Sequence, residues 1–258
     1  MKTVIFAGGL GSRISEESHL KPKPMIEIGG KPILWHIMKI YSHYGYNDFI
    51  ICLGYKGYII KEYFTNYFIH NADITVDLSD NSTTVHKDNS EDFKVTLVDT
   101  GLETKTAGRL QKVKKYLEGE EDFMLTYGDG VSNVDLKALV EHHKQYKKIA
   151  TVTAIQPAGK FGILTHDQSG NISAFTEKPS TEGSWINGGF FVLNKGVFDY
   201  LKSPMEEVMW EQEPMKNLVA NRELTSYRHR GFWKSMDILR DKVELENLWK
   251  NNPQWKVW

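Results

Sequence analysis

The amino-acid sequence predicts an α/β protein built on a mostly parallel central sheet flanked by helices. Three short runs of β-branched and aromatic residues are typical of buried strands: Lys2–Ala7, Asp48–Leu53 and Asp122–Tyr127. Each run stops at a glycine and is followed by apolar residues at helical spacing. This alternation favours a parallel sheet, in which ligands gather at the carboxyl ends of the strands.

The first 148 residues supply the remaining elements of this pattern. Pro32 suits the first turn of a helix whose apolar stripe continues to Tyr44, and Gly45 ends that helix. Asp135 is expected to cap a helix that continues to Lys144. The other expected elements are helices at Tyr58–Phe68 and Ala107–Leu117 and short strands at Ile74–Leu78, Thr83–His86 and Phe93–Val98.

From Ile149 onward the pattern is richer in strands. The expected strands are IATVTAIQ, FGIL, ISAFTEK and INGGFFVLN, and the expected helices are Val197–Leu201, Pro214–Asn221 and Leu239–Lys250. No linker, low-complexity tract or repeat of about 20 to 50 residues divides the chain. We therefore expect a single domain over residues 1–258, with a smaller strand-rich part after residue 148.

The composition excludes several classes of protein. The chain has 258 residues, of which 32 are basic and 33 acidic, and its formal net charge is −1. No global attraction to nucleic acid or to an anionic membrane is therefore expected, and no apolar stretch approaches the ~20 residues that span a bilayer. The single cysteine, Cys52, lies in an apolar run that suits a small buried side chain rather than a catalytic thiol. Together these features favour a reducing, cytoplasmic setting.

A glycine-rich loop, GGLGSR, follows the first expected strand. Gly8, Gly9 and Gly11 would let backbone N–H groups approach an anion closely, and Arg13 would add a fixed positive charge. The dinucleotide-binding pattern would need glycine where Ile14 stands, and the Walker pattern is not matched either. The glycines alone would equally suit a plain strand-to-helix turn.

The segment KPKPM places Lys23 between two prolines, ten residues after Arg13. The prolines stiffen the backbone, so the ammonium group has little conformational freedom to lose when it binds an anion. By itself the segment is typical of a solvated basic turn. Together with Arg13 it favours a phosphate site.

Two aspartates are candidate metal ligands. Asp129 follows a buried strand and lies between two glycines, where a carboxylate suits Mg²⁺ that is shared with substrate phosphates. Asp237, in GFWKSMDILRD, is the candidate second carboxylate. The alternatives are that Asp129 only shapes a turn and that Asp237 caps the last helix.

A further cluster joins the ends of two expected strands. Lys178 could pair with a phosphate, while Glu177 and Asn187 hydrogen-bond the hydroxyls of a sugar. Gly188 would allow the sugar to approach the backbone closely. A strand-end ion pair and a glycine bulge would explain the same residues.

Other chemistries fit the sequence poorly. No cysteine or histidine spacing suits zinc, and the adjacent His142 and His143 of one helix point in different directions. The GxSxG elbow of a serine hydrolase does not occur. An Asp-x-Asp motif is also missing, which disfavours a glycosyltransferase on a similar fold.

Taken in order, the motifs are GGLGSR, KPKPM, GGKPIL, YGDG, EKP, NGGFFVLN and FWKSMD. In this order they resemble the sugar-1-phosphate nucleotidyltransferases, over essentially the whole chain. Further segments of the sequence are similar to the cytidylyl-transferring members of that family. These segments include ILWHIMK, GYKGYIIKEYF, VTLVDTG, TAGRL and WEQEP. The resemblance implies a Rossmann-like nucleotidyltransferase fold. Residues 1–148 would mainly bind the nucleotide and residues 149–258 the sugar phosphate.

The resemblance also implies a reaction, in which CTP and α-D-glucose 1-phosphate give CDP-glucose and pyrophosphate with Mg²⁺ as cofactor. Arg13, Lys23 and Lys178 would be catalytic. Asp129 and Asp237 would bind the metal. The implied nucleotide-binding residues are Gly8, Gly9, Gly11, Ser12, Arg13, Lys23, Thr106, Gly108, Arg109 and Asp129, and the implied sugar-phosphate-binding residues are Glu177, Lys178, Asn187 and Gly188. This chemistry needs positive charge and alignment rather than a covalent nucleophile.

Relatives of this kind form homo-oligomers, for which a hexamer is one candidate, and they begin a route to the 3,6-dideoxyhexoses of lipopolysaccharide O-antigen. Two features depart from the wider family: ISEESHL stands where many relatives have Pro-Leu-Thr, and Arg109 stands where thymidylyl- or uridylyl-transferring relatives would have a small or aliphatic residue. Our hypothesis is that Arg109 helps to select the pyrimidine or binds phosphate from the start of its helix.

Two alternatives stay open. One is the same reaction with UTP or dTTP, because the residues that handle phosphate would look alike. The other is a non-catalytic sensor of nucleotide sugars. A pure binder could lose its metal carboxylates, whereas this chain keeps both Asp129 and Asp237.

Overall fold

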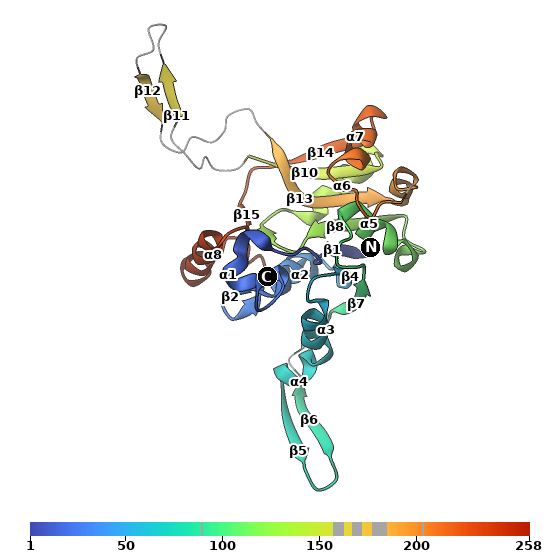
Figure 1. Cartoon of the computed structure of the whole chain (residues 1–258), viewed down its shortest axis with the longest axis vertical. Coiled ribbons are helices and arrows are strands. Elements are labelled where there is room, and N and C mark those ends of the chain that lie inside the picture. Colours follow the sequence, from blue (N-terminus) through green and yellow to red (C-terminus); the bar gives the residue numbers. More distant parts are fainter. Residues whose placement is uncertain (89, 157–162, 167–171, 177–184, 203) are drawn as a thin grey trace.

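The computed structural model describes residues 1–88, 90–156, 163–166, 172–176, 185–202 and 204–258, and it is organised around a seven-stranded sheet (Figure 1). In spatial order the strands are β14 (Leu224–His229), β10 (Ala150–Ile155), β13 (Ile186–Asn194), β8 (Asp122–Tyr127), β1 (Thr3–Phe6), β4 (Asp48–Leu53) and β7 (Lys94–Asp99). Strand β13 runs antiparallel to both of its neighbours, and the other neighbouring pairs are parallel. The predicted mostly parallel sheet is confirmed.

Helices cover both faces of this sheet. One face packs against α2 (Ile33–His43), α6 (Leu136–Tyr146) and α8 (Leu239–Asn251), and the other against α5 (Thr106–Lys112) and α7 (Glu213–Ala220). Successive residues of β1 alternate between the two cores, since Ile5 lies in the first and Val4 in the second, as the period of two in a strand requires. Cys52 is fully buried, and burial raises the pKa of its thiol to about 12, which excludes a reactive thiolate.

Several predicted elements end or break differently in the structure. The expected helix Tyr58–Phe68 is two helices, α3 (Gly57–Thr65) and α4 (Tyr67–Asn71). They separate at Asn66, whose side-chain amide donates to the carbonyl of Glu62. The end of the expected helix Ala107–Leu117 is a 3-10 turn, Lys114–Leu117, and the expected helix Val197–Leu201 is a 3-10 helix throughout, Lys195–Tyr200.

Some short elements were not predicted. Strand β14 at the sheet edge was missed, as were α1 (Ser15–Ser18) and the pair β9 (Gly130–Ser132) and β15 (Trp233–Ser235). The strands β9 and β15 have three residues each, and they form because segments about a hundred residues apart pair with each other. A three-residue strand carries too few positions to show a period of two.

The remaining strands form small two-stranded sheets. They are β2 (Glu27–Ile28) with β3 (Lys31–Pro32), β5 (Ala72–Asp77) with β6 (Ser82–Asp88), and β11 (Ile163–His166) with β12 (Ile172–Thr176). The β5–β6 hairpin projects from the body of the protein beyond α4 (Figure 1). Of the helices in the described ranges, none has the length and apolarity to cross a membrane.

We expect His36 to make the stability of the fold depend on pH. Its ring is buried, Nε2 lies 2.8 Å from the carbonyl oxygen of Ile28, and Nδ1 accepts from the Trp255 indole. Burial lowers its pKa from 6.5 to about 4, so the unfolded chain binds a proton between these values that the folded chain does not. The contribution of the buried neutral His36 ring to the free energy of unfolding is therefore complete above about pH 6.5, and it is lost as the pH falls toward 4.

Urea unfolding of the wild type should give a free energy of unfolding about 2 kcal/mol lower near pH 5 than near pH 7.5 through this residue. The matched measurement is the same pair of titrations on His36→Asn, which should lose this part of the pH dependence. An identical pH dependence in the two proteins would contradict the assignment.

Candidate active site

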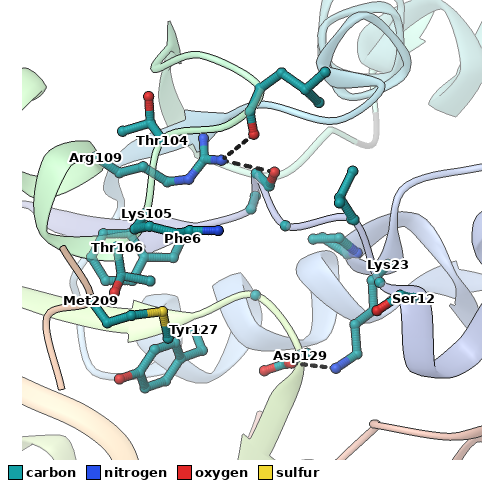
Figure 2. A pocket seen from close by; sticks show the side chains of 18 of the residues that line it. Phe6, Ser12, Lys23, Thr104, Lys105, Thr106, Arg109, Tyr127, Asp129 and Met209 are labelled. Atoms are coloured by element: carbon teal, nitrogen blue, oxygen red, sulfur yellow. Dashed lines mark hydrogen bonds and ion pairs between the residues drawn. The ribbon is translucent and has the colours of Figure 1, made fainter. Parts of the chain in front are cut away.

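All of the predicted nucleotide-binding residues except Gly108 line one cavity at the carboxyl ends of β1 and β8 (Figure 2). The cavity has a volume of about 340 Å³. The expected site residues that line it are Gly8, Gly9, Gly11, Ser12, Arg13, Lys23, Thr106, Arg109, Asp129 and Asp237. The structure thus brings to one place residues from both ends of the chain.

A cluster of four charged groups lies on one side of this cavity. The Lys23 ammonium is 2.5 Å from Oδ2 of Asp129 and 3.0 Å from Oδ1 of Asp237. The Arg13 guanidinium is 2.9 Å from the same oxygen of Asp237. Burial opposes ionisation of Asp237, but the charge and hydrogen bond of Lys23, the Ser235 hydroxyl and the Arg13 charge together outweigh it and hold the pKa of this carboxyl below its ordinary value. Asp237 is therefore ionised at neutral pH.

Pairing of β9 with β15 explains why the two aspartates meet. Asp129 directly precedes β9, Asp237 lies two residues after the end of β15, and Gly130 pairs with Ser235 in register. The Met236 N–H also donates to the Asp129 carbonyl at 2.8 Å. The alternative in which Asp237 caps the last helix is wrong, because the N-cap residue is Ile238 and the Asp237 carboxylate accepts from Lys23, Arg13 and the Ser235 hydroxyl instead.

The donor set fits Mg²⁺. Two carboxylates converge on a single cation, at present the Lys23 ammonium, and both are about a quarter exposed, at 28% and 29%. Across the described ranges no group of three or more His, Cys, Asp or Glu side chains could hold a metal ion. Mg²⁺ is usually held by one or two carboxylates and completes its shell with water and substrate phosphates. The pair suits a metal that arrives with a phosphate ligand.

The glycine loop is fixed by Arg109. Its Nη1 donates to the carbonyl of Leu53 and the hydroxyl of Thr100, and its Nη2 donates to the carbonyls of Gly8 and Leu102. A Cβ atom on Gly8 would lie 2.1 Å from Nη1. Glycine at this position therefore makes room for the guanidinium, a reason that the loop motif does not reveal.

The start of helix α5 packs against residues 205–208, a segment from the second half of the chain. The N–H groups of Lys105 and Ala107 donate to the carbonyls of Glu206 and Val208 at 2.6 and 3.1 Å. Gly108 faces the same segment, since a Cβ there would lie 2.8 Å from the Met205 carbonyl oxygen. Gly108 was expected to bind the nucleotide, but it packs against protein and does not line the cavity. These two N–H groups at the start of the helix are likewise used by protein rather than left for phosphate.

A second, smaller cavity of about 170 Å³ adjoins the first. Tyr127, Asp129 and Asp237 line both cavities, so the carboxylate pair lies where the two meet. Residues that line only the smaller cavity include the predicted sugar-site residues Asn187 and Gly188 together with Trp233. Glu177 and Lys178, the other two predicted sugar-site residues, lie outside the described residues.

Gly188 and Gly189 also shape the sheet. The β10–β13 register shifts between Val152 and Ala154, opposite these glycines, so the alternative of a glycine bulge is confirmed. A Cβ on Gly188 would lie 2.9 Å from the Thr153 carbonyl oxygen, and Gly189 has φ of +82°. The Trp233 indole donates to the Gly188 carbonyl at 2.6 Å. The bulge thus brings the Asn187–Gly189 backbone to the cavity.

Several residues of the site carry little or no signal in the sequence. Lys105, Tyr127 and Met209 line the larger cavity (Figure 2). Tyr127 had a usable signal, because it ends a buried strand directly before Gly128 and Asp129. Lys105 and Met209 had none, because they reach the cavity through the docking of residues 206–208 on the start of α5.

Comparisons with known proteins agree with this geometry. A model of the nucleotidyl transferase family matches residues 2–238. The chain is 54% identical to the glucose-1-phosphate cytidylyltransferase of Salmonella typhi and 47% identical to the probable glucose-1-phosphate cytidylyltransferase of Bacillus subtilis, in each case over the whole of both chains.

Solved structures share the fold. A putative glucose-1-phosphate thymidylyltransferase from Bacillus anthracis has a TM-score of 0.71 at 18% identity, and covers 97% of this chain and 96% of its own. HddC from Yersinia pseudotuberculosis has a TM-score of 0.68 at 22% identity, and covers 96% and 99%. The predicted Rossmann-like nucleotidyltransferase fold is confirmed. From its motifs, its carboxylate pair and these likenesses, the chain belongs to the nucleotidyl transferase family and groups within it with the glucose-1-phosphate cytidylyltransferases.

Proposed function

We propose that this protein transfers the cytidylyl group of CTP to α-D-glucose 1-phosphate, giving CDP-glucose and pyrophosphate. The high identity to cytidylyltransferases over the full length supports the choice of substrates. The observation that carries the proposal is that two cavities meet at Asp129 and Asp237. The larger suits a nucleotide and the smaller a hexose, so the α-phosphate would lie at the shared carboxylates. Such a product would suit a route to 3,6-dideoxyhexoses of O-antigen.

The reaction follows from the charges at this point. A phosphate oxygen of glucose 1-phosphate attacks the α-phosphorus of CTP, the bond from that phosphorus to the bridging oxygen of the β-phosphate breaks, and pyrophosphate leaves. Both reactants are anions, so the barrier includes their repulsion. Arg13 and Lys23 screen that repulsion and hold the phosphates in line for attack. The sugar phosphate is already ionised, so no general base is needed. The role of Lys178 on the sugar phosphate stays a prediction.

Magnesium is part of the proposal. Asp129 and Asp237 would hold the ion, which when bound neutralises phosphate charge and orients the triphosphate. In the structure Lys23 takes up the oxygens that a metal would use. A triphosphate in the cavity would offer Lys23 another anion, which would leave the two carboxylates free to hold the ion.

A pyrophosphate-release assay across CTP, UTP, dTTP and GTP, each with several hexose 1-phosphates, tests the function directly. We expect the highest kcat/KM for CTP with glucose 1-phosphate. A preference for UTP or dTTP would replace the proposed nucleotide. Binding of nucleotide sugar with no pyrophosphate released from any pair would identify a sensor instead of an enzyme.

Arg109 is proposed to favour CTP by fixing the Gly8 backbone, since its terminal N–H groups are directed at protein oxygens. Arg109→Lys keeps the charge but cannot make the four hydrogen bonds. We expect kcat/KM for CTP to fall by about tenfold or more, and the preference over UTP and dTTP to narrow. An unchanged ratio among the three nucleotides would reject the role in base selection.

We also infer a homo-oligomer, with a hexamer as one candidate. Ile74, Val76 and Val85 share one face of the β5–β6 hairpin and are 37%, 52% and 42% exposed. A hairpin of two strands is marginal in water unless a further surface covers it. Light scattering should show an oligomer for the wild type and a smaller species for Val76→Asp. The matched control is Thr84→Asp, because Thr84 points to the opposite face of the hairpin, and this variant should remain an oligomer. A monomeric wild type would contradict the proposal.

A further inference from the structure

Glu211 is a carboxylate beside the two cavities that the reaction described above does not use. One of its oxygens accepts a hydrogen bond from the Tyr127 hydroxyl, and the other accepts from the Thr106 hydroxyl at 2.9 Å. We propose that Glu211 is a positioning residue that holds Thr106 and Tyr127 in place and so sets substrate binding in both cavities. The inference rests on the proposed function, because it names the two substrates whose binding would change.

Tyr127 is the wall common to both cavities. It lines each of them, and its ring packs between Phe6 and Phe191, at centroid distances of 5.9 and 6.2 Å. The Asn187 amide lies 3.4 Å from its hydroxyl, and Cδ2 of the ring would be 2.7 Å from a Cβ on Gly189. A displaced Tyr127 ring would therefore disturb the bulge that brings Asn187 to the sugar cavity.

Thr106 connects the Glu211 carboxylate to the larger cavity, which is proposed to bind the nucleotide. It is the first residue of α5 and lines the larger cavity. Its hydroxyl donates to Glu211 and accepts from the Trp210 N–H at 2.7 Å, so its single proton and one lone pair are both used. Figure 2 shows Thr106, Met209 and Tyr127 together on the side of the cavity away from Lys23. Glu211 thus also anchors the segment that carries Met209.

The geometry favours positioning over substrate contact. Both oxygens of Glu211 are engaged by hydroxyl donors, and Glu211 lines neither cavity. Hydrogen bonds to an ionised acceptor are stronger than neutral ones, which suits a group that fixes two side chains at once.

The test compares the KM values of the two substrates. Tyr127→Phe should raise KM for glucose 1-phosphate, and Thr106→Val should raise KM for CTP. Glu211→Gln should raise both, by about tenfold, because one of the two acceptor oxygens becomes an NH2 group, which cannot accept from the hydroxyl that faces it. The change in kcat should be smaller. In the double variant Glu211→Gln with Tyr127→Phe, KM for glucose 1-phosphate should not exceed that of the worse single variant.

Glu213→Gln is the matched control, because Glu213 is an exposed carboxylate two residues further along the same segment. It should leave both KM values unchanged. A wild type that releases no pyrophosphate from CTP would overturn the proposed function. An active wild type, together with a Glu211→Gln variant whose KM values both stay within about twofold, would overturn this inference alone. Should Glu211→Gln fail to fold, the test rests on the increase in KM for glucose 1-phosphate in Tyr127→Phe and in KM for CTP in Thr106→Val. The absence of both increases would overturn the positioning role.

Discussion

Replacing Asp129 with alanine should lower turnover with CTP and glucose 1-phosphate by about a hundredfold or more. The change removes one of the two carboxylates proposed to hold the metal. It also leaves Lys23 paired with Asp237, 3.0 Å away, without its closer partner at 2.5 Å. Pyrophosphate release at saturating substrates, measured over a range of Mg²⁺ concentrations, gives the effect. We expect the variant to need more Mg²⁺ as well as to turn over more slowly.

Asp48→Ala is the matched control for Asp129→Ala. Asp48 is similarly exposed, at 26% against 28%, and it also pairs with a lysine, Lys94, at 3.3 Å. It begins β4, however, and therefore lies at the amino edge of the sheet, away from the cavity. Turnover should stay close to that of the wild type. Near-normal, Mg²⁺-dependent turnover in Asp129→Ala would show that Asp129 is not a metal ligand.

Replacing Lys23 with alanine should lower turnover to a similar degree, but change metal binding in the opposite direction. Turnover falls because a cation proposed to stabilise phosphate charge is lost, and such groups contribute a few kcal/mol. Without nucleotide, however, the variant leaves Asp129 and Asp237 free of the ammonium that bridges them. A Mn²⁺ titration without nucleotide should therefore show tighter binding to Lys23→Ala than to the wild type.

Lys39→Ala is the matched control for Lys23→Ala. The Lys39 side chain is 18% exposed against 12% for Lys23, and it pairs with Glu91 at 2.7 Å in a different part of the fold. Turnover and Mn²⁺ affinity should both remain at the wild-type level. If Lys23→Ala bound Mn²⁺ no better than the wild type, the competition between ammonium and metal would be refuted, even if turnover fell.

The sequence by itself determined the framework and the chemical types of the site. Strands β1, β4 and β8 were predicted with nearly their observed bounds, because buried apolar runs that stop at glycine are local patterns. Asp135 caps α6 as expected, with its carboxylate accepting from the Ala138 N–H at 3.0 Å. Arg13, Lys23 and Asp129 could be selected because glycine, proline and charge lie next to one another in the chain.

Only the tertiary structure decided how these residues act together. The Asp129–Lys23–Asp237 contact depends on the pairing of β9 with β15, two strands too short to show a period. Gly8 is explained by the Arg109 guanidinium, which comes from a helix a hundred residues later, and Tyr127 and Thr106 share Glu211 from a segment a further hundred residues on. Local periodicity and turn chemistry describe neighbours in sequence. These contacts join distant segments, and they form because burial and hydrogen bonding of the assembled sheet bring those segments together.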